Sequence, residues 1–136
     1  MTEKQAATAS AARHLALNIA LWVLQAFLAF TFLSAGYTKL SGDPLQVELF
    51  ANVGVGQWLR HLTGVLEIAG AIGVLIPPLS GLAACGLAGI MVSAIVITVL
   101  VVPGDLWAPS GFLVLSLLVV LGRWSRTKAL IGTFRR

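Results

Sequence analysis

The stretch TGVLEIAGAIGVLIPP (residues 63–78) contains one charged residue, Glu67, in otherwise apolar surroundings. No charged residue follows from Ile68 to Gly104. A carboxylate at the centre of a bilayer costs roughly 2.5–3.5 kcal/mol on insertion scales, so such a residue usually faces the interior of a bundle and has a partner. The stretch therefore predicts a membrane protein of several spans with one buried carboxylate.

The composition of the whole chain supports a membrane protein. Only 10% of its 136 residues are charged and 58% are hydrophobic, whereas soluble domains contain about 25% charged residues. We predict four transmembrane helices, at about residues 15–38, 58–76, 79–102 and 108–122. The first and third contain 24 residues without charge, and a membrane helix needs about 20. The predicted fold class is an all-α, four-transmembrane-helix bundle that forms a single domain over residues 1–136.

The segments between these spans have their own signals. Pro77-Pro78 predicts a tight turn between the second and third spans. Asp43 has the features of a helix N-cap, Pro44 fits the first helical position and Gln46 completes a capping box. We therefore predict a short helix from residue 44 to about residue 51, lying at the outer membrane interface. Trp107 and Trp124 bracket the short fourth span, as an aromatic belt would.

The two ends of the chain are expected to be tails. Residues 1–12 are small and polar, which predicts a frayed N-terminal segment. A cleaved signal peptide is the alternative for this end, but the apolar run that follows is longer than the usual ~7–15 residues. Residues 123–136 form a basic tail that is expected to contact lipid headgroups. A nucleic-acid partner is not expected, because no aromatic platform alternates with the basic residues.

The distribution of positive charge predicts the orientation. Seven Lys and Arg residues lie in the tails, and two, Lys39 and Arg60, lie in the segments on the other side. The positive-inside rule then places both termini in the cytoplasm, and the protein in the cytoplasmic (inner) membrane as a multi-pass protein. The seven are Lys4, Arg13, Arg123, Arg126, Lys128, Arg135 and Arg136.

Small residues recur at helical spacing on the second and third spans. Such residues let helix backbones approach closely in lipid, so we predict that these two spans form the tight core of the bundle. The residues are Gly64, Gly70, Ala71, Gly73, Gly81, Ala84, Ala88, Gly89 and Ser93. The alternative is that glycine is simply common in membrane helices.

Polar residues also follow one face of the first span. Asn18, Gln25 and Lys39 are separated by multiples of seven residues, and seven residues drift only about 20° on a straight helix. A polar stripe on a membrane helix is expected to face the protein interior. It could form one wall of a polar slot, or it could make hydrogen bonds between helices, worth about 0.6 kcal/mol each.

Glu67 has three alternative states in the sequence. It could pair with Lys39 of the first span, pair with Arg60 seven residues earlier on its own face, or stay neutral because burial raises the pKa of a carboxyl group. Its role could be structural, fixing helix register, or functional, as a proton relay or an acceptor for a polar ligand group. Glu67, Lys39, Gln25, Asn18 and Arg60 are the candidate polar-core or ligand-binding residues.

The sequence contains no catalytic motif and no metal-binding motif. The two histidines, His14 and His61, start spans on opposite sides, so a membrane thickness of about 30 Å is expected between them. The single cysteine, Cys85, cannot close an intramolecular disulfide and is expected to act as a small apolar residue. We therefore predict no catalytic residue and no metal ligand.

Two segments resemble the DoxX-like membrane proteins. FLSAGYTKL (residues 32–40) matches the Gly-x-x-Lys-Leu pattern of that family through Gly36, Lys39 and Leu40. TGVLEIAGAIGVLIPP (residues 63–78) matches its Gly-x-x-Glu-x-x-Gly core through Gly64, Glu67 and Gly70. The resemblance extends over residues 13–121 and implies a small four-helix membrane protein in which Lys39 and Glu67 form a shared polar pair.

What the resemblance implies about function is broad. Some members are linked to quinone-dependent sulfur oxidation or membrane redox complexes, and others resemble assembly helpers. The first hypothesis is therefore a non-catalytic subunit or assembly factor, with a membrane protein partner or a second copy, that holds a lipophilic ligand near Glu67. The alternative is a membrane subunit of a quinone-linked oxidoreductase, with quinone as the candidate cofactor. Proton-coupled transport is a third class, disfavoured because no inverted repeat is evident.

Overall fold

The computed structural model describes residues 2–135, and all of its regular structure is helical. The elements are α1 (Glu3–Ser41), α2 (Pro44–Val53), α3 (Trp58–Leu75), the 3₁₀-helix η1 (Pro77–Leu79), α4 (Ser80–Leu100), α5 (Trp107–Gly122) and α6 (Trp124–Phe134). The predicted all-α class and the short helix between the first two spans are confirmed.

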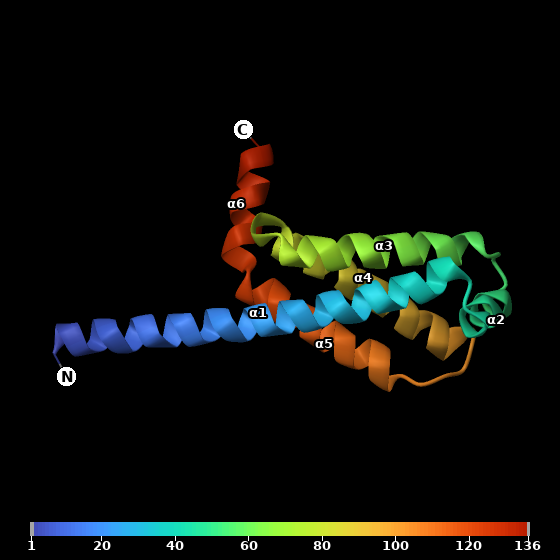
Figure 1. Cartoon of the computed structure of the whole chain (residues 1–136), viewed down its shortest axis with the longest axis horizontal. Helices are drawn as coiled ribbons and strands as arrows, with labels where there is room; N and C mark the ends of the chain where they lie inside the picture. Colours follow the sequence, from blue (N-terminus) through green and yellow to red (C-terminus); the bar gives the residue numbers. More distant parts are fainter. Residues whose placement is uncertain (1, 136) are drawn as a thin grey trace.

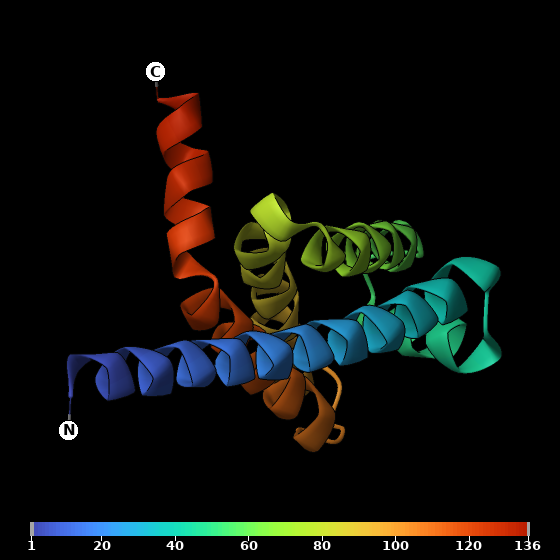
Figure 2. The same ribbon diagram turned by 60° about the vertical axis from the view of Figure 1, so that its left-hand side comes forward.

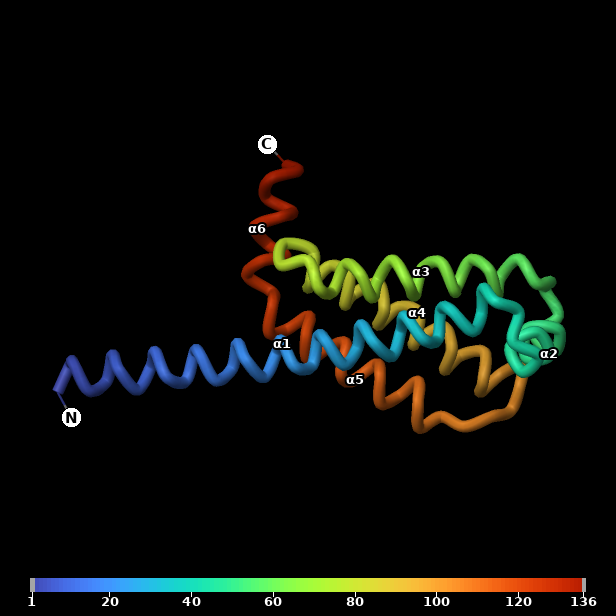
Figure 3. The backbone as a smooth tube through the Cα atoms, viewed as in Figure 1, coloured from blue at the N-terminus to red at the C-terminus, as the bar shows by residue number. Residues whose placement is uncertain are grey.

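Four long helices, α1, α3, α4 and α5, run along the body of the molecule (Figure 1). The short helix α2 and the loop between α4 and α5 lie at one end, which we call the α2 end (Figure 3). The turn η1, helix α6 and the N-terminal part of α1 lie toward the opposite end, which we call the terminal end. Both termini therefore belong to the same half of the molecule.

Three segments are long and apolar enough to cross a membrane by themselves: Glu3–Ser41, Trp58–Leu75 and Pro77–Leu100. A fourth span is obtained if α5 and α6 are counted together, although α6 turns away from α5 by 67°. Figure 2 shows α6 standing apart from the line of α1. The structure thus contains three to four candidate spans.

Helix α1 corrects the prediction for residues 1–12. The described part of that segment is not frayed but belongs to one continuous helix of 39 residues. Thr2 caps its start through a capping box with Gln5, and the segment is rich in alanine, the strongest helix former. Local capping and propensity therefore extend the helix beyond the apolar span.

The start of α2 is predicted well except for one contact. Asp43 is the N-cap, Pro44 occupies the first turn, and the Asp43 carboxylate accepts a hydrogen bond of 2.9 Å from the Leu45 N–H. Gln46 does not complete a capping box. Its Oε1 is instead buried without a hydrogen-bond partner among residues 2–135. The cap is therefore made by the N-cap side chain alone.

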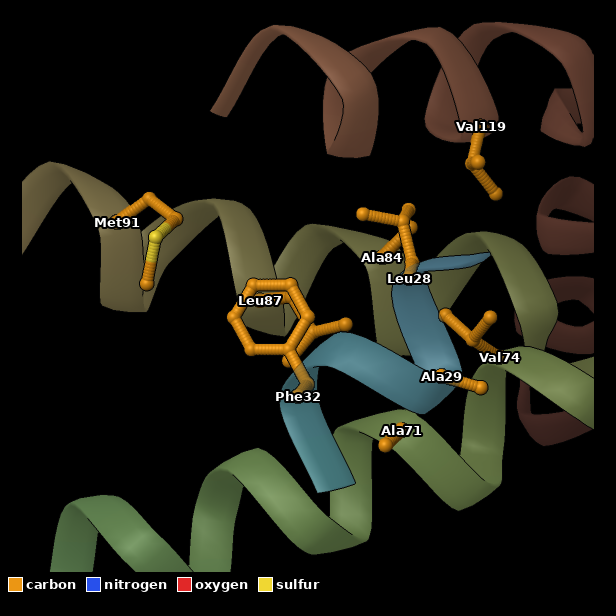
Figure 4. Packing of buried hydrophobic residues seen from close by; sticks show 9 residues of the cluster. All are labelled: Leu28, Ala29, Phe32, Ala71, Val74, Ala84, Leu87, Met91 and Val119. Carbon is orange, nitrogen blue, oxygen red and sulfur yellow. The ribbon is translucent and has the colours of Figure 1, made fainter. Parts of the chain in front are cut away.

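The apolar core lies between α1, α3, α4 and α5, where the side chains of nine residues meet (Figure 4). Phe32 of α1 and Leu87 of α4 both belong to this cluster, and Phe32 packs edge-on against Phe112 of α5, with ring centroids 5.7 Å apart. The outward faces of the same helices carry many exposed large apolar side chains. This combination is typical of helices that face lipid on the outside and one another inside.

The small-residue prediction is only partly right for both helices, because Gly64 of α3 packs against Gly36 and Leu40 of α1 instead of α4. A Cβ atom on Gly70 would lie 2.6 Å from Leu87, and one on Gly73 would lie 2.9 Å from Ala83, so α3 and α4 do approach closely there. Gly89 faces open space and Ser93 is exposed. Gly81 contacts Thr127 of α6 instead of α3. The small residues of α4 therefore pack against two helices, α3 and α6, and some of them pack against neither.

The segment predicted as a basic tail, residues 123–136, contains helix α6. Residues 124–134 are helical, and Arg123 is buried at the junction of α5 and α6 with 5% of its surface exposed. Thr127, one turn into α6, is also buried. The first part of this segment is therefore packed against the bundle.

Candidate functional site

Glu67 pairs with Lys39. The Lys39 Nζ donates a hydrogen bond of 3.1 Å to the Glu67 Oε2, and the two side chains are 13% and 3% exposed. Of the partners that the sequence left open, the geometry selects Lys39 of α1. Arg60 makes no hydrogen bond to Glu67 among the contacts of residues 2–135.

Arg60 instead holds the C-terminal end of α1. Its Nη1 donates to the main-chain carbonyl of Lys39, its Nε donates to Gln57 Oε1 at 2.7 Å, and its Nη2 lies 3.2 Å from His61 Nε2. The last four carbonyls of a helix have no partner within that helix. Arg60 supplies one, and it thereby fixes the main chain that carries Lys39.

Two glycines bring Lys39 and Glu67 together. Gly36 lies one helical turn before Lys39 in α1, and Gly64 lies one turn before Glu67 in α3. A Cβ atom on Gly36 would lie 2.8 Å from the Gly64 carbonyl and 2.6 Å from Ile68. Backbones can approach this closely only where the side chain is absent. The motifs Gly-x-x-Lys and Gly-x-x-Glu are therefore two halves of one close helix crossing.

A cavity of about 630 Å³ lies beside the pair, toward the α2 end. Phe32 of α1, Phe50 of α2, Met91 of α4 and Phe112 of α5 contribute apolar walls. Residues from α3 and from the loop between α4 and α5 complete the lining. Helices α1, α2, α3, α4 and α5 thus all line one mainly apolar space.

Eight polar side chains line this cavity: Thr31, Lys39, Gln46, Thr63, Glu67, Ser93, Thr98 and Asp105. Lys39 and Glu67 lie in its wall, and Gln46 of α2 lines it as well. The buried Gln46 Oε1 is an unused acceptor among residues 2–135. Lys39 has three ammonium hydrogens, and the structure gives it one acceptor, Glu67. The cavity therefore has spare donor and acceptor capacity in mainly apolar surroundings.

A second polar cluster lies nearer the terminal end. Arg123 Nε donates to Gln25 Oε1 at 2.8 Å, and Arg123 Nη1 donates to Asn18 Oδ1 at 2.8 Å. The guanidinium carbon also lies 5.6 Å from the ring centroid of Trp22, within range of a cation–π contact. Arg123 thus ties the junction of α5 and α6 to three residues of α1.

Gln25 connects this cluster to α3. Its Nε2 donates to the main-chain carbonyl of Val74 at 2.7 Å. In a continuing helix that carbonyl would accept from residue 78, but Pro78 has no N–H to donate. Gln25 therefore satisfies a carbonyl that the proline turn leaves without a backbone partner, and this explains a fully buried amide in the core.

The polar stripe of α1 is thus divided between two sites. Asn18 and Gln25 contact Arg123, Lys39 contacts Glu67, and buried Phe32 separates them. The prediction that the stripe faces the interior is confirmed for Gln25, which is fully buried. Arg123 was missed as a site residue because its position beside other basic residues indicated a tail. The signal that could have indicated Arg123 was the pair of amide side chains on α1, Asn18 and Gln25, because their oxygens need a hydrogen-bond donor in the interior.

The described residues contain no group of three or more His, Cys, Asp or Glu side chains that could hold a metal ion.

Comparison with known proteins gives one match. No curated protein and no solved structure matches the chain significantly. The model of the DoxX-like family matches residues 23–121, which include both glycine motifs and the whole of the cavity lining. With its candidate spans, the chain is an integral multi-pass membrane protein, and it belongs to the DoxX-like family.

Proposed function

We propose that this protein is a non-catalytic membrane subunit or assembly factor that holds a lipophilic ligand in the cavity at the α2 end. The observation that carries the proposal is an apolar space of about 630 Å³ with the Lys39–Glu67 pair in its wall. Ligand sites in proteins typically measure ~300–1,000 Å³ and combine apolar walls with a few convergent polar groups. This cavity fits that description.

The polar groups specify the kind of ligand. A carbonyl or ether oxygen can accept from Lys39, and a hydroxyl can donate to Gln46 Oε1 or to the Glu67 carboxylate. The aromatic and aliphatic walls suit a hydrocarbon ring or chain. The ligand is therefore expected to have one small polar head and a large apolar body.

A quinone-linked oxidoreductase subunit is the second candidate. A quinone head carries two carbonyl oxygens, and Lys39 offers hydrogens to one of them inside an apolar cavity. In this reading the cavity binds the quinone while a partner supplies the electrons. The two candidates share the cavity and differ in the ligand and the partner.

The test is recovery of the ligand from protein purified from native membranes in mild detergent. If the first proposal holds, one lipophilic molecule per chain is extracted, a membrane protein copurifies, and the colourless protein does not reduce a quinone analogue with common donors. Quinone recovered at near one per chain establishes the second candidate. Glu67→Gln should lower ligand recovery, whereas Glu48→Gln, which removes an exposed carboxylate outside the cavity lining, should not. Equal recovery from both variants would contradict a site at Glu67.

For orientation, we propose that both termini lie in the cytoplasm and that the protein lies in the cytoplasmic membrane. The seven-to-two distribution of Lys and Arg supports this, as does the position of both ends in the same half of the molecule (Figure 1). A reporter fused after residue 136 should be active only inside, and one inserted near Gly54 only outside. Activity of the C-terminal fusion outside would contradict an even number of spans.

A further inference from the structure

A smaller pocket of about 180 Å³ lies at the terminal end, between α1 and the junction of α5 and α6. Its polar lining comes from His14 and Asn18 of α1 and from Arg123, Ser125 and Arg126. Leu17 and Leu21 add an apolar edge. It shares no lining residue with the cavity at the α2 end.

The two arginines of this pocket have hydrogen-bonding capacity left over. Arg123 Nη2 and Arg126 Nη1 are both buried without a partner among residues 2–135. Arg123 is 5% exposed, and its side-chain partners Gln25 and Asn18 are neutral. Buried guanidinium donors usually have acceptors, so two neighbouring donors without one indicate a missing acceptor.

No carboxylate compensates these charges. All five acidic residues of the chain are within the described part, and its one ion pair joins Lys39 to Glu67. The pocket also lies against the first turn of α6, where main-chain N–H groups lack helical partners. A helix N-terminus favours negative charge. The C-terminus of α5 lies at the same junction and opposes this dipole. The positive potential of the site therefore comes mainly from the two guanidinium groups.

We propose that this pocket binds a phosphate-type anion through Arg123, Arg126 and Ser125. Guanidinium groups recognise phosphate by paired hydrogen bonds, and the Ser125 hydroxyl can donate as well. The anion has two sources with the same chemistry: the headgroup of an anionic phospholipid or free inorganic phosphate. The leucine edge fits the glycerol and chain region of a lipid, and a free phosphate needs only the polar part.

The experiment uses the full-length protein in detergent with two probes. Inorganic phosphate is titrated in one arm, and phosphatidylglycerol is compared with phosphatidylcholine in mixed micelles in the other. Native mass spectrometry counts bound lipid, and the melting temperature reports stabilisation. We expect saturable binding of one anion per chain. Phosphatidylglycerol binding that phosphate does not displace identifies a headgroup site, and displacement identifies a phosphate site.

The matched variants are Arg126→Gln and Lys128→Gln. Both remove one positive charge from α6, but Lys128 is exposed and does not line the pocket. Arg126→Gln should weaken anion affinity roughly fivefold, the effect of one basic residue near an anionic lipid surface, and Lys128→Gln should leave it unchanged. If Arg126→Gln does not fold, Ser125→Leu, which fills the pocket from an exposed position, should give the loss instead. Equal losses in pocket and control variants, or no saturable anion binding by the wild-type protein, would overturn the proposal.

Discussion

The two ends of the bundle differ in how a buried cation is compensated. At the α2 end, Lys39 contacts a carboxylate, and the pair lies beside a large apolar cavity. Toward the terminal end, Arg123 contacts two amide oxygens, and no carboxylate neutralises it. The Lys39–Glu67 pair is close to neutral, whereas Arg123 keeps its charge.

The difference shows how each charge is tolerated. A charge at membrane depth needs an opposite charge because no water can compensate it. Arg123 follows the last residue of α5, at the end where the chain turns into α6, and a guanidinium can remain charged there with neutral partners and nearby headgroups. A paired charge therefore suits the binding of a neutral ligand, and an unpaired one suits the binding of an anion.

The largest effect is expected from separating the pair. Glu67→Leu leaves Lys39 without its counter-ion, and Lys39→Met does the same to Glu67. Removing one partner of a buried ion pair typically costs about 3–5 kcal/mol. The double variant should recover much of that loss, because neither charge remains. A double-mutant cycle on thermal unfolding in detergent measures the coupling.

The same cycle can also show that the two ends do not differ in this way. Strictly additive losses at residues 39 and 67 would show that the pair is not coupled. Unchanged stability in all three variants, together with lost ligand or partner binding, would make Glu67 a functional carboxylate without a structural role.

The second effect concerns Gln25. Gln25→Leu removes the partner of Arg123 Nε and the donor to the Val74 carbonyl, and each unsatisfied buried group costs about 1–3 kcal/mol. We expect a loss of about 2–3 kcal/mol, measured by denaturation in detergent. Gln25→Glu keeps an acceptor for Arg123 but offers no amide donor to Val74. If the carbonyl matters as proposed, Gln25→Glu should still be less stable than the wild-type protein.

The third effect tests whether close backbone contact is needed for the pair. Gly36→Ala places a methyl group against Ile68 and the Gly64 carbonyl, and overpacking of this kind costs about 1–2 kcal/mol. The control is Gly86→Ala, because a Cβ atom there meets nothing within 4 Å. Melting temperatures of the two variants give the comparison. A neutral Gly36→Ala would show that the crossing has room to adjust.

The smallest effect is expected at Cys85, which is exposed on α4 and contributes to neither end. Cys85→Ala should change unfolding by less than about 0.5 kcal/mol, as surface substitutions usually do. The variant also supplies a thiol-free background for labelling. A loss of quinone-linked activity in Cys85→Ala would contradict its role as an outward-facing apolar residue.

Much of the architecture can be predicted from single residues. Charge-free runs give the helices α1 and α4, Pro77-Pro78 gives the turn between α3 and α4, and Asp43-Pro44 gives the start of α2. These signals are local: an apolar run of sufficient length, a missing N–H or a capping side chain acts within a few residues. The elements that follow such signals were therefore predicted, although α1 begins at Glu3, twelve residues before the predicted span.

The contacts between distant residues could be predicted less well. The Lys39–Glu67 pair was one of several alternatives, because helix periodicity gives the face of each residue but not which helices are neighbours. The Arg123 cluster was missed, because its partners lie 98 and 105 residues away in the sequence. The bend of 67° at Arg123 was missed as well. Gly122 directly before it indicates a helix end, but a glycine does not indicate that a second helix follows at an angle.

The uninterrupted course of α1 has a consequence for the segment before the bundle. Each residue of an α-helix rotates the chain by about 100°, and α1 runs without a break from Glu3 to Ser41. The angular position of Lys4 around the helix axis is therefore fixed relative to that of Lys39. One alanine inserted after Ala12 would swing the preceding turns by about 100° around the axis, whereas four inserted residues would return them to within about 40° of their original direction. The direction in which the N-terminal segment faces around the helix axis is therefore set by the number of residues in α1.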